Sequence, residues 1–204
     1  MGASFIDISP PLHAGIAVWP GDVAFSRELT CSFDDAGVEA SSVRTTLHAG
    51  AHADAPSHLH RDGASIDQRD LALYYGPCEV VEVMVAAGGR VPPVGAVRAP
   101  RVLFKTGSSP DPDAFDEDFA ALSPELIDDL ALQGVVLVGI DTPSVDPFRS
   151  VGLESHKAAF ANDLAILEGL VLDEVQPGLY TLIALPLKVV GADASPVRAV
   201  LMTD

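Results

Sequence analysis

Short apolar runs separated by turn residues recur along the chain, and they predict more strands than helices. Residues 5–9, FIDIS, alternate apolar and polar side chains as a half-buried strand does. The segment SSVRTTLH at 41–48 is rich in β-branched residues and predicts a second strand. Continuous apolar runs suit buried strands, and they occupy residues 78–85, 101–106 and 135–141.

Two segments carry helix signals instead. Ser123 suits an N-cap, Pro124 suits the first helical position, and Gly134 suits the end of that helix. Residues 153–160, LESHKAAF, predict a second helix that stops at Asn162. Further apolar segments follow at 164–172 and 181–189. Because strands outnumber helices in a mixed order, we expect a sheet-rich α/β domain with helices packed on the sheet.

Length and composition fit one folded domain. The chain has 204 residues, 48% of them hydrophobic, and its mean hydropathy is +0.29. This length suits a single domain over residues 1–204 with a substantial core. No apolar run reaches membrane-spanning length, and the first residues lack the basic region and apolar core of a secretory signal. We therefore expect a cytoplasmic protein without membrane contact.

The charge balance narrows the set of partners. The formal net charge of −17 argues against nucleic acid, because phosphate binding needs clustered Lys and Arg side chains. Carboxylates next to histidines can instead hold a cation. Cys31 and Cys78 are the only cysteines, and neither belongs to a CxxC pair. We expect both to be buried, reduced thiols.

The stretch HAGAHADAPSH at 48–58 concentrates residues of the kind that bind metals. His48, His52, Asp54 and His58 are spaced by 4, 2 and 4 residues. Gly and Pro within the stretch argue against a helix. A straight strand fails too, because six extended residues span roughly 20 Å, whereas ligands lie about 2 Å from a shared ion. If the first three residues share a metal, the chain must curl between them.

The chemistry of this row suits a hydrolytic metal. Neutral imidazole and carboxylate are ligands for zinc or manganese, and three protein ligands leave a position for water. A bound divalent ion lowers the pKa of that water toward 7. Histidines in exposed turns are the simpler interpretation, and we give it to His60; the clustering of four ligand-type residues favours metal for the others. His58 could shuttle protons near the site without binding the ion.

These residues resemble a known family. The pattern HxGxHxDxPxH is similar to the signature of the metal-dependent cyclase-like hydrolases. The segments WPGD at 19–22, IDTPSVDP at 140–147 and LPLKVVGADASPVRAVL at 185–201 resemble the bacterial kynurenine formamidase branch. The resemblance runs over nearly the whole chain. It implies a swivelling β/β/α fold, a homodimer, a pair of zinc ions, and hydrolysis of N-formyl-L-kynurenine to L-kynurenine and formate in tryptophan degradation.

The resemblance also implies a ligand set. His48, His52 and Asp54 would bind the first zinc, and Asp54 would bridge to the second, which His156 and Glu168 would complete. Twelve residues on one straight helix span about 18 Å, so the last two residues can meet only across a break in the chain. We therefore predict that His156 lies on a helix and Glu168 on the next element. Without the resemblance, His156 would be interpreted as a solvated helix residue. Glu168 would be a charge within an apolar segment, and burying such a charge is costly unless it is paired.

Two further roles follow from the resemblance. His58 would be the proton donor and acceptor. Trp19, the only tryptophan, would contact the substrate; packing is the more common role of an aromatic residue, but stacking on an anilide ring is physically reasonable. No stretch identifies what holds the amino-acid end of the substrate, and Arg44 is a candidate by position only.

Two other functions stay open at this point. The same scaffold could open a cyclic amide such as isatin, with much the same metal site. Alternatively, the chain could bind metal without catalysis, for storage or sensing, although this would leave WPGD and the C-terminal segment unexplained.

Overall fold

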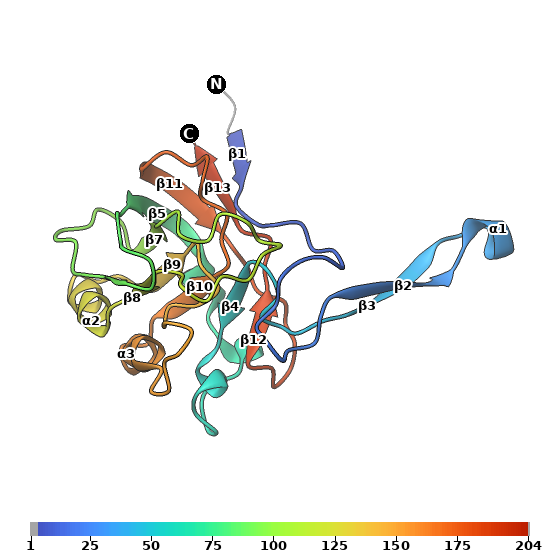
Figure 1. The fold of residues 1–204 in the computed structure, drawn as a ribbon, viewed down its shortest axis with the longest axis horizontal. Helices are drawn as coiled ribbons and strands as arrows, with labels where there is room; N and C mark the ends of the chain where they lie inside the picture. The colour runs from blue at the N-terminus through green and yellow to red at the C-terminus, as the bar shows by residue number, and fades with distance from the viewer. Residues whose placement is uncertain (1–3, 204) are drawn as a thin grey trace.

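The computed structural model describes residues 4–203 and is built around one nine-stranded sheet (Figure 1). The strands in order across the sheet are β1 (Ser4–Asp7), β13 (Val200–Thr203), β11 (Gly178–Ile183), β5 (Tyr75–Glu82), β7 (Arg101–Lys105), β9 (Leu137–Ile140), β10 (Ala165–Glu168), β4 (His52–Asp54) and β12 (Ala194–Pro196). The four central strands, β5, β7, β9 and β10, run parallel. All other pairings in this sheet are antiparallel.

Smaller elements complete the fold within the described residues. Two short ladders pair β2 (Ser26–Cys31) with β3 (Ala40–Arg44) and β6 (Arg90–Val91) with β8 (Ala121–Leu122). The helices are α1 (Phe33–Ala36), α2 (Pro124–Leu132) and α3 (Glu154–Ala161), with 3₁₀ turns η1 (Pro56–His58), η2 (Ile66–Gln68) and η3 (Leu71–Tyr74). The sheet-rich α/β architecture predicted from the sequence is confirmed.

The central strands are buried on both faces, which explains their continuous apolar runs. Along β7, Val102 and Phe104 face the core beneath the helices α2 and α3, whereas Leu103 faces the opposite core. Residues of β9 and β10 divide in the same way, because successive side chains of a strand point to opposite faces. The sheet is therefore a rigid layer between two apolar clusters, and its strand ends are held in fixed positions.

The predicted helices are confirmed together with their signals. The Ser123 hydroxyl oxygen accepts a hydrogen bond from Leu126 N at 3.1 Å, and Pro124 opens α2. Gly134 follows that helix with a φ of 85°, a backbone conformation that glycine adopts without strain. The second helix, α3, ends with Asn162 as its C-cap. No helix among residues 4–203 is long and apolar enough to cross a membrane.

The strand expected at 41–48 belongs to an arm that projects from the body of the molecule (Figure 1). This arm consists of β2, α1 and β3, and most of its side chains are exposed. Its second strand ends at Arg44, and the chain turns before it reaches the histidine row. Cys31 lies on the arm and is only partly buried, so the expectation of two buried thiols holds for Cys78 alone. A two-stranded arm has no core in which to bury a side chain.

Candidate metal centre

A tight turn delivers the histidine row to the end of the sheet. Gly50 sits between His48 and β4 with a φ of 61°, so the chain curls there as the ligand spacing requires. The turn packs directly on the end of β10, because a Cβ added to Gly169 would overlap the carbonyl oxygen of Gly50. In the sheet register Glu168 is the partner of His52. Directly paired residues on neighbouring strands point to the same face, so the imidazole and the carboxylate meet.

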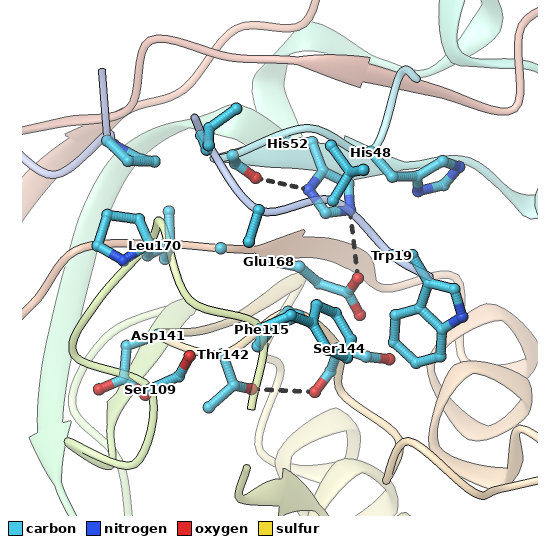
Figure 2. Close-up of a pocket in the computed structure, with 18 of the residues that line it drawn as sticks. Trp19, His48, His52, Ser109, Phe115, Asp141, Thr142, Ser144, Glu168 and Leu170 are labelled. Atoms are coloured by element: carbon cyan, nitrogen blue, oxygen red, sulfur yellow. Dashed lines mark hydrogen bonds and ion pairs between the residues drawn. The ribbon is translucent and has the colours of Figure 1, made fainter. Parts of the chain in front are cut away.

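The first three residues of the row converge on one point. His48 Nδ1 lies 3.0 Å from Asp54 Oδ1, and His52 Nε2 lies 3.5 Å from the same oxygen. His52 Nε2 is also 3.2 Å from Glu168 Oε2. Because His52 Nδ1 donates to the carbonyl of Gly50 at 2.8 Å, Nε2 keeps its lone pair facing the carboxylates. Figure 2 shows His48, His52 and Glu168 around the pocket.

The helix α3 brings a third histidine to the cluster. His156 Nδ1 donates to Asp146 at 2.8 Å, and the backbone N–H of His156 donates to the same carboxylate at 3.0 Å. His156 Nε2 then faces Asp54 Oδ2 at 3.2 Å and Glu168 Oε1 at 3.3 Å. The chain reverses after the helix, where Asp163 adopts a φ of 56°. The prediction that His156 and Glu168 meet across a break between two elements is confirmed.

The residues of this cluster fit divalent metal ions. His52, Asp54, His156 and Glu168 are each at most 3% exposed, so two carboxylates are buried side by side. His52 Nε2 and Asp54 Oδ1 lie close to groups of possible opposite charge, but both are among the described buried atoms whose contacts lack the geometry of a hydrogen bond. Buried polar atoms without partners are costly, and an ion between these atoms would satisfy both. One ligand atom each from His48, His52 and Asp54 lies within 4.8 Å of the other two.

Neighbouring charges shift the pKa values of His48, His156 and Asp54 toward their ionised forms. Burial alone would lower the pKa of His48, but Asp54 and then Asp193 raise it to about 9. Burial would likewise lower the pKa of His156, which Glu168, Asp146 and Asp54 raise well above its ordinary value. Burial alone would raise the pKa of Asp54, but His156 and His48 hold it well below its ordinary value. Without a cation, the protein compensates the two carboxylates with imidazolium protons.

His58 lies beside the cluster and lines a cavity. It ends the 3₁₀ turn η1, and its side chain is 31% exposed. Its ring centroid is 4.5 Å from that of His48 and 5.8 Å from that of His156. The side chain therefore reaches both halves of the cluster and the solvent.

A cavity of about 610 Å³ opens onto the cluster and carries an aromatic wall. The centroid of Trp19 lies 5.4 Å from that of Phe115, in an edge-to-face arrangement, and 5.1 Å from that of Phe148. Trp19 lies on the opposite side of the pocket from Leu170 in Figure 2. Arg44 is not among the residues that line this cavity, because it lies on the arm.

Comparison with known proteins places the chain in a family. Residues 6–147 match the family model described as "Putative cyclase". A kynurenine formamidase of Sphingopyxis alaskensis is 46% identical over 200 residues, covering 96% of this chain and 96% of that protein. This chain belongs to the cyclase family.

Solved structures share the fold of this cyclase-family chain. A potential metal-dependent hydrolase with cyclase activity is 28% identical and has a TM-score of 0.84, covering 100% of this chain and 99% of its own. An isatin hydrolase bound to the product analogue thioisatinate also has a TM-score of 0.84, covering 98% and 92%. Its identity of 19% shows a common fold alone. The predicted cyclase-like fold is confirmed.

Sequence reasoning missed four residues of this cyclase-family site. Asp146 and Asp193 lie in segments that carry the family resemblance, but nothing in their spacing gave them a role. Phe115 and Phe148 line the cavity from loops without a periodic pattern. A search for carboxylates near the resemblance segments could have found the first two; no signal in a single sequence marks the two aromatic residues.

The charges of the cluster predict that binding of a divalent metal ion releases protons, and zinc can serve as the probe. A ligating imidazole must be neutral, and His48 with a pKa of about 9 is protonated at pH 7. We expect the apparent zinc affinity to rise with pH between 6 and 9, about tenfold per unit for each displaced proton. Competition with a chromogenic chelator across this range measures it. A constant affinity would contradict the prediction.

The same pKa makes the stability of the metal-free protein depend on pH. The folded pKa of His48 is raised above its ordinary value of 6.5. Its contribution to stability is therefore fully present below pH 6.5 and is lost as the pH rises through about 9. Denaturant unfolding of the metal-free chain at pH 6 and pH 9 would show this loss.

Proposed function

We propose that this chain hydrolyses N-formyl-L-kynurenine to L-kynurenine and formate in tryptophan degradation. The observation that carries the proposal is the meeting of His48, His52 and Asp54 with His156 and Glu168 beneath an aromatic-walled cavity. The relative named kynurenine formamidase, 46% identical over almost the full length, supports this substrate.

The proposed cofactor is a pair of zinc ions, for which manganese is the alternative. His48, His52 and Asp54 would hold the first ion, and Asp54, His156 and Glu168 the second. When bound, such ions supply an activated water near neutral pH and polarise a carbonyl group. Imidazole and carboxylate donors without a thiolate fit either metal. The structural neighbour described as a metal-dependent hydrolase supports the metal requirement.

His58 is the proposed proton carrier. Its ring lies beside His48 and His156 and faces the cavity, without the buried position of a ligand. In hydrolysis its imidazole would accept a proton from the attacking water and pass it to the leaving aniline nitrogen. The resemblance to the family supports this assignment.

Trp19 is the proposed substrate contact, with Phe115 and Phe148 completing the wall behind it. The anilide ring would pack on these aromatic side chains while the formyl group points to the cluster. We predict that Trp19→Leu raises KM roughly five- to thirtyfold, the equivalent of about 1–2 kcal/mol, and lowers kcat less. Steady-state kinetics on N-formylkynurenine measure the split. An unchanged KM would remove Trp19 from the binding site.

The proposal is tested by measuring metal content per chain together with formate release from N-formylkynurenine. Isatin assayed on the same zinc-loaded protein tests the other hydrolase activity of this fold, and faster opening of isatin would reverse the assignment. Bound zinc without turnover of either substrate would favour a metal-binding protein. A formyl carbon carries no bulk, so we expect a narrow site to reject the N-acetyl analogue; comparable turnover of that analogue would count against this selectivity.

We also propose that the chain acts as a single domain over residues 1–204, as a homodimer and in the cytoplasm. The family resemblance supports the dimer, and sedimentation equilibrium would test it.

A further inference from the structure

One carboxylate outside the proposed ligand set touches two histidines of the site. Asp193 Oδ2 lies 3.0 Å from His48 Nε2 and 3.5 Å from His58 Nδ1. Nothing in the histidine signature or in the proposed ligand set gives Asp193 a role. A single oxygen that contacts a proposed ligand and the proposed proton carrier fixes the two rings relative to each other.

The sheet holds Asp193 in place. The residue immediately precedes β12, which pairs with β4, the strand that carries His52 and Asp54. The backbone carbonyl of Asp193 accepts a hydrogen bond from Ala55 N at 2.9 Å. Its Cα position is therefore set by the same ladder that positions the ligands, although its side chain is 47% exposed.

Each of the three proposed histidine ligands has one ring nitrogen on an outer hydrogen-bond acceptor and the other facing the cluster. His52 donates through Nδ1 to the Gly50 carbonyl, and His156 donates through Nδ1 to Asp146, so each keeps Nε2 free to bind. His48 is reversed: Nδ1 faces Asp54 and Nε2 faces Asp193. Both nitrogens of His48 therefore face a carboxylate, and Nδ1 would lose its proton when a metal ion binds between it and Asp54. A carboxylate only accepts hydrogen bonds, so Asp193 would keep the remaining proton on Nε2. The lone pair of Nδ1 then points into the cluster.

We propose that Asp193 is a positioning residue with two actions, an inference that rests on the proposed function. Through His48 it fixes the ring orientation and tautomer needed for metal binding. Through His58 it holds the proton carrier beside the cluster, within reach of the cavity. Such outer partners of a ligating histidine affect metal affinity by about 10- to 100-fold.

The alternative is that Asp193 only anchors the loop before β12, and the chain offers a matched control for it. Asp67 Oδ1 accepts hydrogen bonds from Gly191 N at 2.9 Å and from Ser65 Oγ at 2.6 Å. It therefore fastens the same loop, but no contact joins it to a histidine of the site. Asp67→Ala removes that acceptor, so an effect shared by Asp67→Ala and Asp193→Ala would belong to the loop.

The experiment compares Asp193→Ala, Asp193→Asn and Asp67→Ala with the unmodified chain. Chelator competition gives the zinc affinities, and kinetics at saturating zinc separate kcat from KM. We expect Asp193→Ala to weaken zinc binding at the proposed position that His48 completes by about 10- to 100-fold. We also expect it to lower kcat at saturating zinc with little change in KM. Asp193→Asn, which keeps an acceptor oxygen, should recover part of both losses, and Asp67→Ala should lower only the melting temperature.

Any other outcome contradicts one or both of the two proposed actions of Asp193. Wild-type zinc affinity in Asp193→Ala overturns the action through His48, and full kcat at saturating zinc overturns the action through His58. Equal losses in Asp67→Ala overturn both actions. If Asp193→Ala does not fold, Asp193→Asn carries the same comparison. Absence of zinc binding or turnover in the unmodified chain would instead refute the proposed function.

Discussion

Replacing Asp54 with asparagine is expected to abolish tight zinc binding and to lower kcat/KM at least about a thousandfold, equivalent to roughly 4 kcal/mol. The two oxygens of Asp54 together face all three histidines of the proposed ligand set: Oδ1 faces His48 and His52, and Oδ2 faces His156. Glu168 faces two of them, His52 and His156. A neutral amide removes the charge shared by both proposed ion positions. It also presents N–H donors where ligand atoms are needed.

The measurement is zinc per chain by elemental analysis, followed by formate release. The matched control is Asp116→Asn, since Asp116 is exposed and its carboxylate only accepts a local hydrogen bond from Asp118 N. The control should keep full metal content and activity. Retention of two zinc ions by Asp54→Asn would show that this carboxylate does not bridge the site.

Replacing His58 with alanine is expected to lower kcat about 10²- to 10⁴-fold, the usual contribution of general acid–base catalysis. Zinc content should stay at the wild-type level, because the partly exposed His58 is not needed to complete either proposed ligand set. The separation of the two readouts distinguishes a proton carrier from a ligand. Elemental analysis and saturating-substrate kinetics measure them.

The matched control for this variant is His60→Ala. His60 lies two residues farther along, is exposed and does not line the cavity, in agreement with its assignment to a solvated turn. Its removal should leave kcat unchanged. A His58→Ala variant with wild-type kcat would exclude the proton-carrier role, and its loss of zinc would instead make His58 a ligand. Full zinc content with no turnover in the unmodified chain would favour the non-catalytic alternative.

Local features of this fold could be predicted because they depend on neighbouring residues. The caps of α2 lie within a few positions of the helix, and the buried strands are marked by their own apolar runs. The curl at Gly50 follows from the requirement that ligands six residues apart reach one ion. The break between His156 and Glu168 follows from the length of a helix in the same way.

Long-range contacts could not be predicted, because they depend on strand order. The pairing of Glu168 with His52 and the placement of Asp193 beside His48 follow from the position of β4 between β10 and β12. Nothing in the local sequence encodes that order. The strand expected at 41–48 shows the limit of a local signal. A strand forms over Ala40–Arg44 only, without Thr45 and Thr46, and it leaves the body of the protein as an arm.

The position of β4 has a consequence for the synthesis of the chain. Both of its neighbours in the sheet come from residues beyond 164. The strand that carries His52 and Asp54 therefore has no partner strands to pair with until the C-terminal strands leave the ribosome. Contacts between residues so far apart in sequence form slowly. Metal should therefore load only after translation is nearly complete, and C-terminally truncated nascent chains should remain empty even in zinc-replete cells.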